Sequence, residues 1–215
     1  MSTRPINLIV VDDHQLVRAG LRQTLGGERD LRIQLECQSG REALDGLRQH
    51  PCDVLLLDIS LPDMSGLEVL AKVRQHHERT AVLVISGFPE TQFGINVLRA
   101  GASGYVCKTV DSSELLRAVR TVARGHRYLG PDLADLLVSG LDGPGDGPRH
   151  SALSEREFQV FCRLAKGDAP GEIARQLGLS AKTISTYRSR ILEKMRFRSN
   201  ADLTTYALQN ELISN

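Results

Sequence analysis

The sequence predicts a doubly wound α/β domain built on a five-stranded parallel sheet, followed by a smaller all-α domain. Short apolar runs alternate with segments of helical periodicity over residues 6–125, as strands and helices do in a parallel sheet. From residue 151 onward only helical patterns occur. Residues 140–150 separate the two parts and contain four Gly and two Pro, which is typical of an exposed linker.

Five apolar runs are the predicted strands of the first domain. Each is followed by a segment with apolar residues at helical spacing, so the strands are expected to lie parallel with helices on both faces of the sheet. Two of these helices begin at residues with capping-box spacing, Ser65 with Glu68 and Asp111 with Glu114. The predicted strands are Asn7–Val11, Arg32–Glu36, Val54–Leu57, Ala81–Ile85 and Tyr105–Cys107.

The rest of the chain is predicted to be helical apart from the linker. A short helix fits residues 131–139, and four more fit the tail. A helix, a tight turn containing Gly178 and a longer basic helix make a helix-turn-helix pattern. The predicted tail helices run from Ser154 to about Lys166, from Pro170 to Leu177, from about Ala181 to about Arg196, and onward from Ser199. We therefore expect a first domain at residues 1–125, a linker at 126–150 and a second domain at 151–215.

Charge is divided unevenly between the two expected domains. Residues 151–215 hold ten Lys and Arg against seven Asp and Glu, a net charge of +3, so residues 1–150 carry −2 in a chain of net +1. This contrast favours two domains with different partners. The four cysteines, at positions 37, 52, 107 and 162, have no metal-binding spacing and fit core positions in a reducing compartment. The N-terminus resembles neither a signal peptide nor a membrane span, so the predicted location is the cytoplasm.

Charged and hydroxyl side chains follow the predicted strands at one edge of the sheet. Asp12 and Asp13 follow the first strand, Asp58 the third, Ser86 the fourth and Lys108 the fifth. Ligands of doubly wound sheets bind beyond the carboxyl ends of the strands, so these side chains are expected to converge. Three clustered carboxylates call for a divalent cation such as Mg²⁺. One aspartate could then act as a nucleophile toward a phosphoryl group, and Asp58 is the central candidate.

Residues 6–125 resemble the receiver domain of bacterial two-component response regulators, which has a flavodoxin-like fold. The matching stretches are V-V-D-D-H, L-L-L-D-I-S-L-P-D-M-S-G-L-E, V-I-S-G and A-G-A-S-G-Y-V-C-K. The resemblance implies that Asp58 accepts phosphate from a histidine kinase or a phosphotransfer protein. It implies that Asp13, Asp58 and the carbonyl of Ser60 ligate Mg²⁺, with Asp12 reaching the metal through water.

The same resemblance assigns roles to three further residues. Lys108 would contact the phosphoryl group, Ser86 would swing toward it, and Tyr105 would turn inward in step. On spacing alone, Tyr105 could equally be an amphipathic aromatic at a sheet edge. Receiver domains commonly have Pro after the lysine. Here Thr109 follows, so the peptide after Lys108 loses the usual reason to be cis.

The basic helix of the tail has the character of a DNA-reading element. Its first half is rich in short polar and hydroxyl side chains, and basic residues surround them. On charge alone, a solvated face of a small helical bundle is an equal reading. The candidate DNA contacts are Lys182, Thr183, Ser185, Thr186, Tyr187, Arg188, Ser189, Arg190 and Lys194, while Ile184, Ile191 and Leu192 are left to pack inward.

Residues 151–210 resemble the LuxR-type helix-turn-helix domain. The matching stretches are L-S-E-R-E-F-Q-V-F, E-I-A-R-Q-L-G-L-S, K-T-I-S-T-Y-R-S-R-I-L-E-K-M and S-N-A-D-L. The resemblance implies that Ser185, Thr186 and Ser189 face bases. A departure at Ala169-Pro170-Gly171, where the family often has Ser-Asn-Lys, removes a potential phosphate contact. The last helix is expected to meet its twin in a DNA-bound dimer on inverted-repeat half-sites, through Ala201, Leu203, Ala207 and Leu208.

These observations together predict a response-regulator transcription factor of the NarL/FixJ type, which is not an enzyme and acts as a homodimer. One alternative is an aspartyl-phosphate phosphatase of the haloacid dehalogenase type. Such enzymes need a second Asp two residues after the nucleophile, where this chain has Ser60. Another alternative is a regulator that binds DNA without phosphorylation. The chain keeps Asp12, Asp13, Asp58, Ser86 and Lys108, and this complete set argues against a phosphorylation site that has lost its function.

Overall fold

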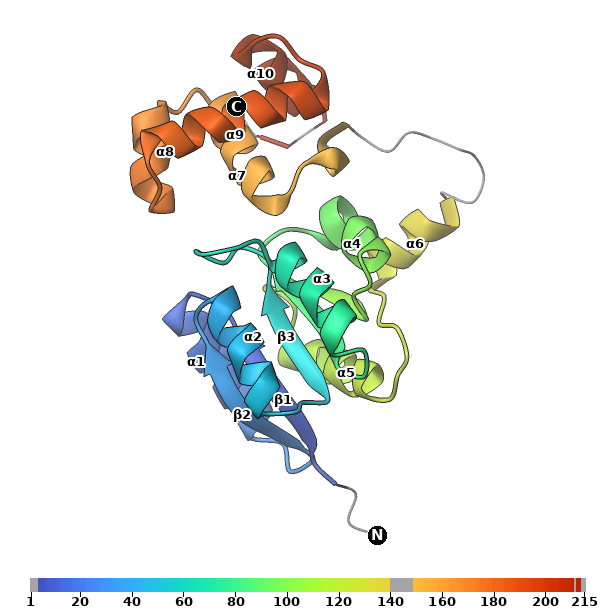
Figure 1. Ribbon diagram of the computed structural model, residues 1–215. Helices are drawn as coiled ribbons and strands as arrows, with labels where there is room; N and C mark the ends of the chain where they lie inside the picture. Colours follow the sequence, from blue (N-terminus) through green and yellow to red (C-terminus); the bar gives the residue numbers. More distant parts are fainter. Residues whose placement is uncertain (1–3, 140–148, 211, 214–215) are drawn as a thin grey trace. The chain divides into compact units, whose positions relative to one another are not determined.

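The computed structural model describes residues 4–139, 149–210 and 212–213. The chain divides into two compact units, residues 1–144 and 145–215 (Figure 1). Most of the predicted Gly- and Pro-rich linker, residues 140–148, lies outside the described residues.

The N-terminal unit is built on a five-stranded parallel sheet with the order β2-β1-β3-β4-β5, which confirms the predicted fold class. Each predicted strand agrees with the observed one to within a residue at either end. All five residues of β3 are buried, as expected of a central strand covered on both faces. The strands are β1 (Ile6–Val11), β2 (Leu31–Cys37), β3 (Val54–Asp58), β4 (Ala81–Ser86) and β5 (Gly104–Cys107).

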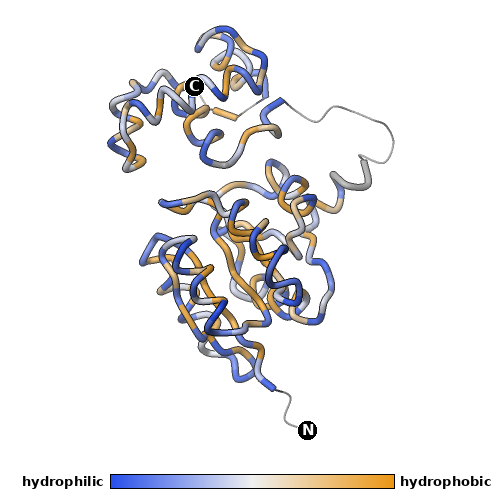
Figure 2. The backbone as a smooth tube through the Cα atoms, viewed as in Figure 1, coloured by the Kyte–Doolittle hydropathy of each residue, from blue (hydrophilic) through white to orange (hydrophobic). Residues whose placement is uncertain are grey.

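Helices cover both faces of this sheet. On one face, α1 and α5 pack against the alternate strand residues that include Leu8, Leu56 and Leu83. The tube in Figure 2 shows hydrophobic residues gathered along the strands of this unit. The helices are α1 (Gln15–Gly26), α2 (Gly40–Gln49), α3 (Gly66–His76), α4 (Glu90–Arg99), α5 (Ser112–Ala123) and the predicted short helix α6 (Pro131–Ser139).

Two of the predicted helix starts show different capping contacts. Asp111 accepts a hydrogen bond from the Glu114 amide at 2.8 Å, as its spacing predicts. Ser65 instead accepts from the Leu67 amide at 3.2 Å, so its contact with Glu68 is through the backbone carbonyl of Ser65 only. Both contacts satisfy amides that have no partner within their own helix.

Where the structure describes it, the C-terminal unit is a compact bundle of four helices preceded by a short 3₁₀ turn. Ser154 and Glu157 form the predicted capping box at the start of α7. Gly178 closes α8 in the left-handed conformation, with φ of 65°, as its position predicts. The core of the bundle includes Phe158, Phe161 and Ile191. Its elements are η2 (Arg149–Ala152), α7 (Glu155–Ala165), α8 (Pro170–Leu177), α9 (Ala181–Met195) and α10 (Asn200–Gln209).

The four cysteines are free thiols in this structure. Cys37 and Cys52 are buried, and burial raises the pKa of each thiol to about 12. They therefore behave as small apolar core residues at neutral pH. Among the described residues, no helix combines the length and the apolar character that crossing a bilayer requires.

Candidate functional site

The predicted acidic edge forms at the carboxyl ends of the parallel strands. Asp12 and Asp58 are each only 1% exposed, although they follow different strands. Asp13 lies beside them, with a side chain that is 32% exposed. The adjacent strands β1 and β3 bring these residues together, because their residues lie in register up to Val11 and Leu57.

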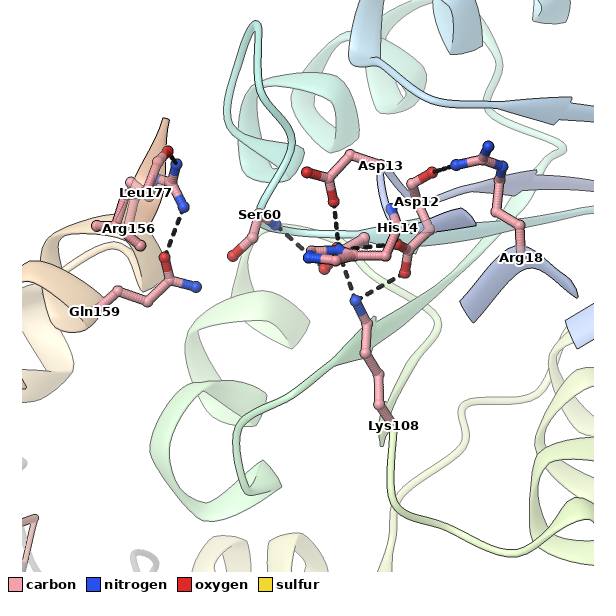
Figure 3. A network of polar contacts seen from close by, with 10 residues as sticks. Asp12, Asp13, His14, Arg18, Ser60, Lys108, Arg156, Gln159 and Leu177 are labelled. Atoms are coloured by element: carbon pink, nitrogen blue, oxygen red, sulfur yellow. Dashed lines mark hydrogen bonds and ion pairs between the residues drawn. The ribbon is translucent and has the colours of Figure 1, made fainter. Parts of the chain in front are cut away.

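Lys108 is the cation that faces these carboxylates (Figure 3). Its Nζ lies 2.7 Å from Asp12 Oδ2 and 2.8 Å from Asp58 Oδ2. The backbone amide of Lys108 donates to the Ser86 carbonyl at 2.6 Å, which ties the end of β5 to the end of β4. The carboxylates of Asp12 and Asp58 thus meet at the ammonium group of Lys108.

Burial and charge act in opposite directions on the two central groups. Burial raises the pKa of Asp58, and the nearby Lys108 offsets this only in part. Burial alone would lower the pKa of Lys108, but its contacts with Asp58 and Asp12 raise it overall. Lys108 is therefore stabilised as a cation. Lys108 offsets only part of the cost of burying the Asp58 carboxylate, so the pKa of Asp58 stays raised.

The net negative charge of the cluster favours the binding of a divalent cation. Ligand atoms of Asp12, Asp13, His14 and Asp58 all lie within 4.8 Å of one another. Asp12 and Asp58 contact the Lys108 ammonium, and Asp13 contacts His14 beside them. The three carboxylates therefore exceed the charge of the lysine by two negative charges, which a divalent cation could balance. Oxygen donors of this kind suit a hard divalent ion.

Two neighbours of this cluster had no role in the sequence prediction. His14 Nδ1 lies 2.6 Å from Asp13 Oδ1, and the His14 amide donates to Asp12 Oδ1 at 2.8 Å. The Arg18 guanidinium donates to the Asp12 carbonyl at 2.6 Å. The motif V-V-D-D-H already contained His14, but the direction of an exposed side chain in a loop is not encoded in such a pattern.

The loop after β3 folds tightly over Asp58. The Ser60 amide donates to Asp58 Oδ1 at 3.2 Å, and the Gly66 amide donates to the Ile59 carbonyl at 2.9 Å. A Cβ atom at Gly66 would lie 2.5 Å from the Asp58 carbonyl oxygen and 2.6 Å from the Ile59 Cα. Only glycine fits there, because any side chain would push the backbone of Asp58 out of place.

Ser86 and Tyr105 are linked through the loop between β4 and α4. Ser86 is fully buried, and its Oγ accepts from the Phe88 amide at 3.1 Å. Tyr105 is also fully buried, and its hydroxyl donates to the Phe88 carbonyl at 2.8 Å. Tyr105 is thus turned inward in this structure. The peptide bond between Lys108 and Thr109 is trans, like every peptide bond of the described residues.

The predicted DNA contacts lie on α9. Ile184, Ile191 and Met195 are buried on one side of the helix, and Leu192 is half-buried. Ser185 and Ser189 donate to carbonyls one turn earlier, each at 3.1 Å, which leaves their hydroxyl oxygens oriented as acceptors. The exposed members of the predicted set are Lys182, Ser185, Thr186, Ser189, Arg190 and Lys194, and the half-buried ones are Thr183, Tyr187 and Arg188.

Two of the predicted DNA contacts are engaged within the bundle. Lys194 Nζ lies 2.6 Å from Oε2 of Glu157, a carboxylate that is almost fully buried. The Arg188 Nε donates to Asn200 Oδ1 at 2.8 Å and so connects α9 to α10. Both side chains therefore stabilise the bundle in addition to any contact with a ligand.

The four predicted dimer contacts on α10 differ in exposure. Leu203 and Ala207 are fully buried in the core of the bundle, so they offer no surface to a second copy. Ala201 and Leu208 are exposed, Leu208 to 41%. An apolar stripe on a helix can face either its own core or a partner, and the sequence alone did not distinguish these.

Two family models match the chain. Residues 8–120 match the response regulator receiver domain. Residues 151–207 match the bacterial regulatory proteins of the luxR family. The two matches cover the N-terminal sheet and the C-terminal bundle respectively.

Similar proteins match nearly the whole length of this chain. Response regulator UvrY of Escherichia coli (strain K12) is 33% identical over 208 residues, which cover 96% of this chain and 95% of that protein. Transcriptional regulatory protein UhpA of Salmonella typhimurium is 41% identical over 198 residues, which cover 92% and 95%. A structure of the Salmonella typhimurium RcsB response regulator has a similar fold, with a TM-score of 0.60, 24% identity, and coverage of 96% of this chain and 100% of that one.

Proposed function

The chain belongs to the NarL/FixJ-type response regulators, DNA-binding transcription regulators that join a receiver domain to a LuxR-type domain, and on this basis we propose that Asp58 is its phosphoacceptor. This family consists of transcription factors rather than enzymes, so the phosphatase alternative is set aside. Receiver domains accept phosphoryl groups from kinases. We infer that a sensor histidine kinase, or a phosphotransfer protein, is the donor for this chain.

The observation that carries the proposal is the setting of the Asp58 carboxylate. It is buried, it lies 2.8 Å from the Lys108 ammonium, and it shares the strand ends with Asp12 and Asp13. A carboxylate oxygen of Asp58 would attack phosphorus, the new O–P bond would form, and the bond from phosphorus to the donor would break. Lys108 would stabilise negative charge on the transferred group.

The negative charge of the cluster supports Mg²⁺ as the cofactor of phosphorylation. Asp13, Asp58 and the Ser60 carbonyl would hold it directly, and Asp12 would hold it through water. When bound, the ion supplies positive charge that screens the carboxylates from an incoming phosphoryl group. Ser86 would reorient toward the phosphoryl group, and the buried position of Tyr105 would accompany that state.

The C-terminal bundle supports binding to double-stranded DNA through the exposed face of α9. Lys182, Arg190 and the hydroxyl side chains would contact phosphates and bases, with Arg188, Tyr187, Thr183 and Lys194 at the margin of this face. The active form would be a homodimer on inverted-repeat half-sites, with Ala201 and Leu208 available on α10. We assign residues 1–125 to the receiver and 151–215 to the DNA-binding domain of a cytoplasmic protein. Residues 126–150 connect the two, and the first part of this connection, with Tyr128 and Leu133, packs on the receiver.

The experiment that tests the proposal is labelling by a small acyl-phosphate donor in the presence of Mg²⁺. Phosphorylated and unphosphorylated chains are separated by phosphate-affinity electrophoresis, and the modified residue is identified by mass spectrometry after borohydride trapping. We expect labelling of the wild type and none of Asp58→Asn. Asp45→Asn, at an exposed carboxylate of α2, is the matched control and should label normally. Labelling that survives Asp58→Asn would refute the proposal.

A further inference from the structure

The segment that follows α5 returns to the N-terminal unit and packs against its edge. Tyr128 pairs with Gly104 in a parallel bridge beside β5, and its amide donates to the Ser103 carbonyl at 2.9 Å. The Tyr128 hydroxyl donates to Glu114 at 2.6 Å and accepts from Arg117 at 3.2 Å. The segment thereby covers the start of β5 at Gly104 before α6 begins.

Helix α6 then docks on α4, and both an apolar and a polar contact join the two helices at Leu133. Leu133 is fully buried, and it occupies the space that a side chain at Gly94 of α4 would fill. A Cβ atom at Gly94 would lie 2.7 Å from Leu133 Cδ2. Figure 1 shows α4 and α6 side by side.

The polar contact comes from Glu90, the first residue of α4. Its Oε1 accepts a hydrogen bond from the Leu133 amide at 3.2 Å, so the carboxylate caps the N-terminus of α6. Gly130 approaches the same carboxylate so closely that a Cβ atom there would overlap with it. Burial raises the pKa of Glu90, which is consistent with a carboxylate enclosed between two helices.

The loop that ends in Glu90 begins at the residue expected to sense the phosphoryl group. Ser86 Oγ holds the Phe88 amide, Tyr105 holds the Phe88 carbonyl, and Glu90 follows two residues later. The Phe88 ring also meets the Phe93 ring of α4 edge to face, with centroids 5.5 Å apart. If Ser86 turned toward a phosphoryl group, its contact with the Phe88 amide would break and the loop would shift.

We propose that the contact of Glu90 and Gly94 with α6 is releasable, and that phosphorylation of Asp58 loosens it through the loop from Ser86 to Glu90. This inference rests on the proposed function, because it takes Asp58 as the phosphoacceptor. In this proposal, the phosphorylation state of Asp58 at the strand ends controls whether α6 stays attached to the receiver. Glu90 is a positioning residue in this scheme, since it touches α6 and not the phosphoryl group.

Amide hydrogen exchange of the full-length chain tests the contact itself. Glu90→Ala removes a charged acceptor, and we expect the amides of residues 133–135 to exchange about tenfold faster. Gly94→Ala should do the same by displacing Leu133, although alanine favours the helical conformation of α4. Unchanged exchange in both variants would overturn the proposal.

Each variant has a matched control within the same unit. Glu68 lies in the first turn of α3, as Glu90 does in α4, so Glu68→Ala removes a similar favourable charge from a helix start without touching α6. Gly20 lies within α1 with nothing within 4 Å of an added Cβ, so Gly20→Ala repeats the Gly94 substitution without displacing a neighbour. Both controls should leave exchange at residues 133–135 within twofold of the wild type.

The second arm compares phosphorylated and unphosphorylated wild type. Phosphorylation should accelerate exchange at residues 133–135 about tenfold in the wild type, and it should add less in Glu90→Ala, where the polar half of the contact is already lost and only the packing of Leu133 on Gly94 is left to loosen. If mass spectrometry shows modified Asp58 but these amides are unchanged, the coupling is overturned while the proposed function stands. If Asp58 is not modified at all, both fail together.

Discussion

The ammonium of Lys108 lies 2.8 Å from Asp58 Oδ2, although fifty residues separate the two in the chain. The same nitrogen lies 2.7 Å from Asp12 Oδ2. Without a bound metal ion, Lys108 is the cation that these two buried carboxylates share. Any divalent ion that binds here shares those carboxylates with the lysine, so the stability of the site and its affinity for metal are linked.

Lys108→Ala should destabilise the receiver domain in the absence of metal and make its stability more dependent on Mg²⁺. The change leaves two buried carboxylates without their shared partner, at a cost of about 2 kcal/mol in the free energy of unfolding. Urea titrations with and without 10 mM Mg²⁺ (roughly a saturating concentration for weak oxygen-ligand sites) measure this. Lys72→Ala, at an exposed position of α3, is the control. Equal Mg²⁺ effects in variant and wild type would contradict the shared-site interpretation.

Lys108→Ala should also impair the response to phosphorylation, because it removes the cation beside the phosphoryl group. The measurement is the DNA affinity of the full chain before and after treatment with an acyl-phosphate donor. A variant whose phosphorylation-dependent gain equals that of the wild type would remove Lys108 from the signalling role.

Arg190→Ala should weaken DNA binding and lower its dependence on salt. Arg190 is exposed on α9, and the loss of one phosphate contact reduces the slope of log affinity against log salt by about 0.9. Arg188→Ala together with Arg190→Ala should have a larger effect, part of which reflects the lost bond to Asn200. Gel-shift titrations at several salt concentrations measure the DNA affinity and its salt dependence for the single and the double variant, with Lys72→Ala as the control. An unchanged slope would place α9 outside the DNA interface.

Lys194→Ala should lower the stability of the C-terminal bundle. The change leaves the buried Glu157 without its ammonium partner at 2.6 Å, which costs about 1 to 3 kcal/mol. The double variant with Glu157→Gln should recover part of the loss, because no unpaired charge is then buried. Thermal unfolding of the full chain measures this, with Lys182→Ala on the same helix as the control. Equal stability of the two lysine variants would show that the pair contributes little.

The C-terminal bundle should lose stability as the pH falls below about 6.5. Burial lowers the pKa of His150, whose ring packs against Phe158 and whose Nδ1 lies 3.0 Å from the Tyr206 hydroxyl. The unfolded chain therefore binds a proton before the folded one does, and this favours unfolding as the pH decreases through that range. His150→Phe should remove this part of the pH dependence. Melting curves between pH 5 and 7.5 (the range of imidazole titration) test this prediction. If the stability of the variant depends on pH as that of the wild type does, His150 is not the cause.

The sequence predicted the sheet and its acidic edge well because both depend on local order along the chain. A strand buried on both faces is a continuous apolar run, and β3 with its five buried residues is the clearest case. Parallel strands end at the same edge, so residues that follow them meet there. That rule alone brought Asp12, Asp58 and Lys108 together.

Contacts between helices were harder to predict, because they depend on how the helices cross. Lys194 has the sequence context of a DNA contact, yet it pairs with Glu157 from α7. Leu203 and Ala207 form an apolar stripe that suits a dimer, yet the stripe faces the core of its own bundle. Glu90 looks like an ordinary first-turn acid of α4, and only the position of α6 gives it a partner.

The return of residues 126–135 to the sheet edge sets a practical boundary for domain swaps. A hybrid regulator fused at residue 125 would keep all five strands but lose Tyr128 beside Gly104 and Leu133 on α4. Such a hybrid would uncover the start of β5 at Gly104 and the apolar surface of α4 beneath Leu133, which invites aggregation. A junction placed after residue 139 would keep Tyr128 and Leu133 with the receiver, so it is the better fusion point for a chimera.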